Sequence, residues 1–289
     1  MPLLKVAAGT INTTPLAWEE NKKHIIESIE EARNQHVSLL CLPELCITGY
    51  GCEDAFYSPN TLAQAIESLH EIVPHTSGIA VSVGLPMQFN SKIYNTACFI
   101  VNKRILGFVA KQHLPNYGVF YEDRWFHRWP ANARDEIKVR DFSYPFGDLV
   151  FDVSGIRIGF DICEDAWVAQ RPGRNHFDRG VDVILNPSAS PFAFHKFITR
   201  ERFVIDGSRS YSCSYVYTNL LGNESGRLIF DGDAMIASNG TLLASSPRFG
   251  YHDYPITSAV IDTDVTRLSH SQIKSALPTG NWKVVDTFE

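Results

Sequence analysis

Short apolar runs alternate with amphipathic segments over the first 90 residues. In the clearest amphipathic segment, Ile25, Ile29 and Ala32 recur at helical spacing while charged residues fill the other positions. The apolar runs are nearly continuous, which is typical of strands buried on both faces. We predict strands at 3–10, 37–42 and 79–86, and helices at 18–35 and 62–73.

After about residue 90, the hydrophobic pattern predicts pairs of adjacent strands. Apolar runs on either side of residues 102–104 predict a β-hairpin, as do the runs around 154–155, and the Asn-Gly pair at 239–240 is typical of a tight hairpin turn. Further strands are predicted at 181–188, 215–222 and 256–262, and a helix at 197–212. Hairpins interleaved with β-α units predict an α/β fold with one large mixed sheet or two stacked ones.

Composition narrows the class of protein. The chain has 289 residues, 44% hydrophobic and 20% charged, which are globular proportions. Lys plus Arg is 26 against 32 Asp plus Glu, and the net charge of -6 disfavours general binding to nucleic acid or anionic membranes. No apolar run reaches the ~18 residues of a membrane helix, and the N-terminus does not resemble a signal peptide. We therefore expect a cytoplasmic protein.

The cysteines and histidines do not suggest a metal site. None of the six cysteines forms a CxxC pair, and the ten histidines are scattered. Cys41, Cys46 and Cys98 lie in apolar runs, where buried free thiols are expected. No repeat or linker interrupts residues 1–265, which we predict to be one domain. The polar segment 266–289 is predicted to be an arm or a linker.

Three reactive side chains follow predicted strands: Glu44 after residues 37–42, Lys111 after ILGFVA, and Cys163 after IRIGFDI. Alone, Glu44 is typical of a helix N-cap or an ion pair, Lys111 of an exposed strand end, and Cys163 of an inert thiol. The acids that flank Cys163 should raise its pKa, so a nucleophilic Cys163 needs a cation and a base nearby.

Together these side chains suggest acyl transfer from an amide. A thiol attacks the carbonyl carbon, a carboxylate moves its proton to the leaving amine, and an ammonium stabilises the oxyanion. The small residues at 186–191 end another predicted strand. They either let a ligand approach the backbone or form a plain turn, which Asn-Pro and Ser-Pro both favour.

Four longer strings carry a family resemblance: PELCITGYGCED, KQHLPNYGVFYEDRWF, GFDICEDAW and NPSASPF. Over residues 4–265 the chain resembles the glutaminase domain of glutamine-dependent NAD+ synthetases, a branch of the carbon-nitrogen hydrolase (nitrilase) superfamily. The resemblance implies a four-layer αββα sandwich, with two stacked mixed sheets and helices outside. It also implies a triad of Glu44, Lys111 and Cys163, with Glu122 as a second carboxylate that positions the lysine.

The same resemblance implies L-glutamine as the substrate. Tyr117 falls at a position that contacts glutamine, and the α-amino and carboxylate groups are recognised at the positions of Glu164, Ser190 and Lys196. Some relatives carry arginine in place of Lys196, and lysine keeps the charge without the bidentate fork. Cys163 would form a γ-glutamyl thioester, with the Glu164 N–H and the Lys111 ammonium holding the oxyanion. The ammonia would pass to an ATP-dependent domain that amidates deamido-NAD+.

The chain departs from that family in one respect, because it has neither an SGGxDS nor a GxxxxGK[ST] phosphate loop. We therefore expect no cofactor here. ATP and Mg would serve only a synthetase domain on the same or a separate polypeptide. The alternatives are a free-standing amidase or nitrilase for another small amide, and a non-catalytic subunit. The resemblance implies a homo-oligomer. Trp125, Phe126 and Trp129 could line the site, pack in the core or contact a subunit.

Overall fold

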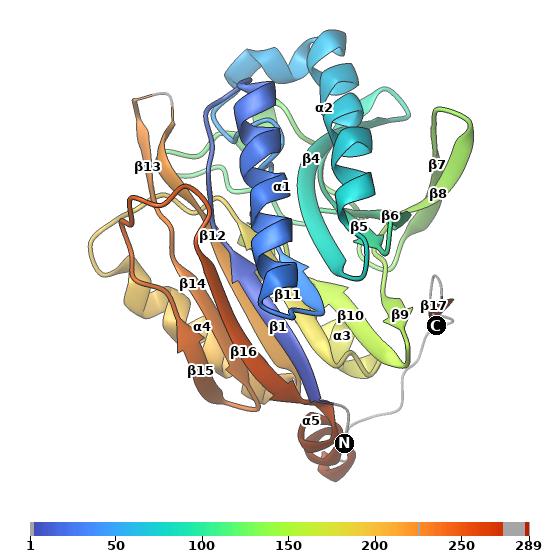
Figure 1. Cartoon of the computed structure of the whole chain (residues 1–289), viewed down its shortest axis with the longest axis vertical. Coiled ribbons are helices and arrows are strands. Elements are labelled where there is room, and N and C mark those ends of the chain that lie inside the picture. Colours follow the sequence, from blue (N-terminus) through green and yellow to red (C-terminus); the bar gives the residue numbers. More distant parts are fainter. Residues whose placement is uncertain (1–2, 225, 274–286, 289) are drawn as a thin grey trace.

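The computed structural model describes residues 3–224, 226–273 and 287–288, and its strands form two mixed β-sheets (Figure 1). The first sheet consists, in spatial order, of β16 (Ile256–Asp262), β1 (Leu3–Gly9), β3 (Leu39–Cys41), β4 (Ala80–Phe89), β5 (Lys92–Val101), β6 (Arg104–Ala110), β8 (Phe142–Gly147) and β7 (Arg134–Val139). The second consists of β15 (Thr241–Ser245), β14 (Ala234–Ser238), β12 (Ser214–Glu224), β11 (Val183–Ser188), β10 (Ile156–Phe160), β9 (Phe151–Val153) and β17 (Thr287–Phe288), with β2 (Ile11–Asn12) and β13 (Leu228–Asp231) paired to β12.

Helices cover the outer face of each sheet. On the first sheet lie α1 (Trp18–Asn34) and α2 (Pro59–Ile72), which Figure 1 shows in front of the strands. Their buried side chains, such as Ile29 and Leu69, pack in one core with Val81 and Val83 of β4. On the second sheet lie α3 (Gly173–Asp178) and α4 (Lys196–Ser210). A fifth helix, α5 (Thr263–Gln272), follows β16.

A separate core lies between the two sheets. Phe99 of β5 contacts Phe151 of β9 and Phe160 of β10, with ring centroids 5.0 and 5.8 Å apart, and all three side chains are buried. The order of layers is therefore helices, sheet, sheet, helices. This confirms the predicted αββα sandwich.

Strand direction brings particular strand ends together. β3 pairs in parallel with β1 and β4, and two antiparallel steps through β5 make β6 run in the same direction. In the second sheet β10, β11 and β12 are parallel. Because carboxyl ends of parallel strands share an edge, the residues that follow β3 and β6 meet those that follow β10 and β11.

The predicted hairpins form where expected. Asn102 and Lys103, between β5 and β6, have φ values of 46° and 67°, and Asn239 has a φ of 47° between β14 and β15. These left-handed values are those of a tight hairpin turn. The strand predicted at 256–262 matches β16, whereas the β7–β8 hairpin and α5 were not predicted.

Several other expectations can be compared with the structure. All six cysteines are free and buried, which confirms the buried thiols at positions 41, 46 and 98. Trp125, Phe126 and Trp129 are at most 7% exposed and belong to the same core as the buried side chains of α1 and α2. The expected boundary at 265/266 falls inside α5, and residues 274–286 and 289 of the predicted arm lie outside the described residues. No helix in the described ranges is long and apolar enough to cross a membrane.

Candidate active site

Glu44 lies in the loop after β3 and is 1% exposed. Its Oε1 accepts hydrogen bonds from Lys111 Nζ at 2.5 Å and from Asn95 Nδ2 at 2.7 Å, and its Oε2 accepts one from the Ala189 backbone N–H at 2.7 Å. The last contact crosses from the first sheet to the second. A buried carboxylate with three donors is held in one orientation, and those donors replace its shell of water.

Glu44 can approach β4 this closely because residue 84 is glycine. A Cβ at Gly84 would lie 2.3 Å from the Leu45 nitrogen and 2.6 Å from the Pro43 oxygen. No side chain fits at that distance. The close packing of β4 against the 43–45 loop therefore fixes the position of Glu44 relative to the first sheet.

Lys111 follows β6 and is fully buried between two carboxylates. Its Nζ donates to Glu122 Oε1 and Oε2 at 2.8 and 2.9 Å, in addition to Glu44. Burial favours the neutral amine, but the charges of Glu122 and Glu44 outweigh it and raise the pKa of Lys111 well above its usual value. The side chain is a fixed cation inside the protein.

Glu122 is the first residue of a short 3-10 helix, Glu122–Arg124, and is 1% exposed. Besides Lys111 it accepts a hydrogen bond from the Tyr50 hydroxyl at 2.8 Å. Burial raises the pKa of Glu122 to about 7, against the opposing effect of Lys111. Lys111 thus links Glu122 to Glu44.

Cys163 follows β10, at the start of a 3-10 helix of residues Cys163–Ala166, and has a φ of 46°. A left-handed cysteine is uncommon, and such strained positions cluster at active sites. Burial is the largest cause that raises the pKa of the Cys163 thiol, followed by the charge of Glu44, while Lys111 and the Ala189 N–H lower it. The pKa is raised as expected, but the leading causes are burial and Glu44 rather than the flanking acids.

The flanking acids have other partners. Asp165 accepts hydrogen bonds from the backbone N–H groups of Gln112, His113 and Ile162, so it ties the segment after β6 to the one after β10. Asp161 accepts one from the Tyr215 hydroxyl at 3.0 Å. Both carboxyl groups are buried structural groups behind the site.

The expected substrate-binding residues have partners of their own. The Tyr117 hydroxyl donates to Glu164 Oε2 at 3.1 Å, and Tyr117 is 56% exposed. Lys196 donates to the Pro191 carbonyl at 3.1 Å and lies 5.2 Å from the ring centroid of Phe120. Burial, with a smaller contribution from Arg200, lowers the pKa of Lys196 to about 8, and the charges of Asp231 and Glu164 oppose that shift.

Ser190 is 1% exposed, and its backbone is tightly held: its N–H donates to Asn219 Oδ1 at 2.7 Å and its carbonyl accepts from Asn219 Nδ2 at 2.8 Å. Asn219 was missed by the sequence reasoning, as were Tyr50, Asn95 and Ala189. A signal existed for Asn95, because a buried asparagine in the middle of an apolar strand needs a partner.

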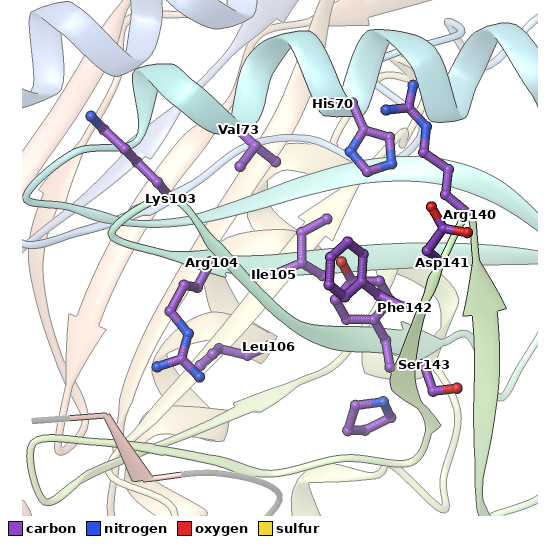
Figure 2. Close-up of a pocket in the computed structure, with 12 residues that line it drawn as sticks. His70, Val73, Lys103, Arg104, Ile105, Leu106, Arg140, Asp141, Phe142 and Ser143 are labelled. Atoms are coloured by element: carbon purple, nitrogen blue, oxygen red, sulfur yellow. The ribbon is translucent and has the colours of Figure 1, made fainter.

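A cavity of about 690 Å³ lies away from this site, between α2 and the turns that precede β6 and β8 (Figure 2). His70, Arg104 and Phe142 are among its lining residues, and none of the twelve belongs to the Glu-Lys-Cys set. The cavity is therefore separate from the candidate site. Within the described ranges, no three His, Cys, Asp or Glu side chains converge as metal ligands.

The fold and the Glu-Lys-Cys arrangement define a class of hydrolase. Residues 5–268 match the carbon-nitrogen hydrolase family model, and the chain belongs to that family. Within it, the chain is homologous to the corresponding part of glutamine-dependent NAD+ synthetases. It is 33% identical to the human enzyme over 284 residues, which cover 93% of this chain and 40% of that protein. It is 31% identical to the Drosophila melanogaster enzyme, of which 36% is covered.

Solved structures give the same grouping. The glutamine-dependent NAD+ synthetase of Cytophaga hutchinsonii superposes with a TM-score of 0.85 and 45% identity, over 90% of this chain and 43% of that one. An amidase from Nesterenkonia sp. shares the fold at a TM-score of 0.72 and 18% identity, over 91% and 92% of the two chains. The present chain spans about two fifths of the length of the curated synthetases it matches.

Proposed function

We propose that this chain hydrolyses L-glutamine to glutamate and ammonia through a thioester on Cys163. The observation that carries the proposal is the bonding of Glu44, which joins the Lys111 ammonium to the Ala189 N–H beside the thiol. That arrangement supplies base, cation and nucleophile for amide cleavage. Homology to enzymes named glutamine-dependent supports glutamine as the amide.

In the first half of the reaction, Glu44 takes the proton of the neutral Cys163 thiol as sulfur attacks the side-chain amide carbon. Lys111 is already charged and buried, so it can stabilise the developing oxyanion together with the Glu164 backbone N–H. Protonated Glu44 then gives its proton to the amide nitrogen. The C–N bond breaks and ammonia leaves.

In the second half, Glu44 takes a proton from water as the water oxygen attacks the thioester carbonyl. The C–S bond breaks, the thiolate recovers the proton, and glutamate leaves. Glu122 holds Lys111 through both carboxylate oxygens, so the ammonium stays in place while Glu44 gains and loses its proton.

For the substrate, we propose that Glu164 binds the α-amino group and Lys196 the α-carboxylate, with Tyr117 and Ser190 lining the pocket. Lys196 offers an ammonium and Glu164 a carboxylate, which suits the two charges of an amino acid. A simple aliphatic amide of the same length lacks both charges. It should be hydrolysed less efficiently.

We further propose that the ammonia serves ATP-dependent conversion of deamido-NAD+ to NAD+ by a synthetase domain, and that the chain acts in the cytoplasm as a homo-oligomer. The homology to synthetases more than twice its length supports the first part. Sedimentation velocity of the purified chain would test the assembly. A monomer at micromolar concentration would contradict it.

The test of the reaction uses a diazoketone analogue of glutamine on the purified protein, followed by intact mass and peptide mapping. We expect one adduct on Cys163, suppressed by excess glutamine. A Cys163→Ala variant should remain unlabelled. In parallel, ammonia release from glutamine and from butyramide should favour glutamine, and Lys196→Met should reduce that preference.

Two outcomes would contradict the proposal in different ways. Labelling of Cys163 that glutamine does not suppress, with faster hydrolysis of butyramide, would make the chain an amidase for another substrate. A folded protein with no adduct and no hydrolysis of any small amide or nitrile would make it a non-catalytic member of the family.

A further inference from the structure

The loop at 188–191 acts on both reacting groups through its backbone. The Ala189 N–H donates to Glu44 Oε2 at 2.7 Å, and the same N–H lowers the pKa of the Cys163 thiol. Ala189 is fully buried. A backbone donor placed between base and nucleophile is useful only if the loop holds it there to within a few tenths of an ångström.

Two buried side chains hold that loop. Asn219 makes a pair of hydrogen bonds with the backbone of Ser190, one to its carbonyl at 2.8 Å and one from its N–H at 2.7 Å. Arg200 Nη2 donates to the same carbonyl at 2.6 Å and to the Pro191 carbonyl at 3.2 Å. The residue that follows Ala189 is therefore fixed on both of its polar backbone atoms.

Asp231 orients both of these side chains. Arg200 Nη1 donates to its two carboxylate oxygens at 2.8 and 2.7 Å, and Asn219 Nδ2 donates to Oδ1 at 3.0 Å. All three side chains are at most 1% exposed. A buried ion pair adds little net stability over an apolar packing of similar volume, so stability alone is a weak reason for this network.

We propose that Asn219 and Arg200, oriented by Asp231, are positioning residues that set the Ala189 N–H against Glu44 and Cys163 and so activate the thiol. The inference rests on the proposed role of Cys163 as nucleophile. Neither residue touches the reacting atoms, because each acts through the loop backbone. Arg200 lies one helical turn after Lys196, on the same face of α4. That face supports the loop through Arg200 and, nearer the start of the helix, carries Lys196.

The test measures how fast iodoacetamide alkylates Cys163 at one pH, by peptide mapping, in wild-type, Asn219→Ala and Arg200→Lys proteins. Iodoacetamide needs only a reactive thiol, so the readout does not depend on glutamine. Loss of one hydrogen bond to a charged group predicts an alkylation rate about 10- to 100-fold below wild type. Arg200→Lys keeps the positive charge but loses one of the two donor arms.

Arg179→Met is the matched control. Arg179 is also a buried arginine paired with an aspartate, Asp148, at 2.7 Å, and its other hydrogen bond goes to Asn132, outside the catalytic cluster. This variant should lose stability yet keep the wild-type alkylation rate per folded chain. Circular dichroism and urea unfolding would establish the folded fraction of every variant.

The inference would be overturned if folded Asn219→Ala were alkylated at a rate within twofold of wild type. It would also be overturned if the alkylation rate of Arg179→Met fell as far as that of Asn219→Ala. If Asn219→Ala does not fold, Arg200→Lys decides by the same criterion. A wild-type Cys163 that iodoacetamide does not modify would overturn both this inference and the proposed function. Fast alkylation without glutamine hydrolysis would count only against the proposed substrate.

Discussion

The buried carboxyl group of Asp161 makes the folding of this chain depend on pH. Its Oδ1 accepts no hydrogen bond, its Oδ2 accepts one from the Tyr215 hydroxyl, and burial raises its pKa to about 8. Between about pH 4 and 8 the folded state keeps a proton that the unfolded chain releases. Raising the pH through this window therefore destabilises the fold, by up to about 1.4 kcal/mol per pH unit.

Asp161→Asn should remove this dependence, because the amide is neutral at every pH and can still accept from Tyr215. We expect wild type to lose roughly 2–3 kcal/mol of unfolding free energy relative to the variant between pH 5 and pH 7. Urea unfolding of both proteins at several pH values measures the difference. A difference that stays constant with pH would show that Asp161 is ionised when folded.

Glu122 should make the rate of glutamine hydrolysis depend on pH in a way that Glu122→Gln does not. Above about pH 7 its carboxylate holds Lys111 by an ion pair, and below that pH it becomes neutral, as glutamine is at every pH. The ratio of wild-type to variant rates of glutamine hydrolysis, in which Lys111 stabilises the oxyanion, should be about 10 to 100 at pH 8.5 and approach 1 at pH 5.5. A ratio independent of pH would place the titration elsewhere.

Among the elements, those with strong apolar patterns could be predicted and those with weak patterns could not. The strand at 256–262 and the turn at 102–103 follow from β-type runs and left-handed turn residues. In α5 only Thr263 and Thr266 are buried, so the helix has no apolar stripe, and its start is marked instead by Asp262, which accepts from the Asp264 N–H. Hydrophobic periodicity cannot detect such a helix.

The same limit applies to the candidate site. Glu44, Lys111 and Cys163 could be predicted because each follows an apolar strand, where a reactive side chain is conspicuous. The contacts of Ala189 and Asn219 could not, because they run through backbone atoms and exist only once the second sheet packs against the first. Sequence shows which side chains are available, whereas the supporting hydrogen bonds depend on tertiary packing.

Gly84→Ala tests whether the contact between β4 and the 43–45 loop positions Glu44. The new methyl group would lie within 2.6 Å of backbone atoms of Pro43 and Leu45, and a backbone cannot rotate away as a side chain can. We expect the loop to move, glutamine hydrolysis to fall at least about 10-fold, and stability to fall by about 1–3 kcal/mol.

Gly250→Ala is the matched control for this change, since nothing lies within 4 Å of the added methyl group and the backbone there is not left-handed. Its activity and urea midpoint should equal those of wild type. Full activity in Gly84→Ala would mean that the loop can accommodate the methyl group without moving Glu44.

In the whole molecule, the site exists only while the two sheets are stacked. Glu44 and Lys111 come from the first sheet, and Cys163 and Ala189 come from the second. Phe99 lies in the core between the sheets and contacts Phe151 and Phe160 across it. We therefore expect thiol activation and global folding to be lost in a single transition.

Phe99→Ala should lower the free energy of unfolding by about 3–5 kcal/mol, because it leaves a cavity between the sheets. Tryptophan fluorescence reports the fold and the alkylation rate of Cys163 reports the site. In urea, both should change at one midpoint in wild type and at one lower midpoint in the variant. Loss of fast alkylation at a urea concentration where fluorescence is still native would show that the sheets separate at the catalytic edge before the rest of the chain unfolds. In that case, the core between the sheets would not be what holds the two halves of the site together.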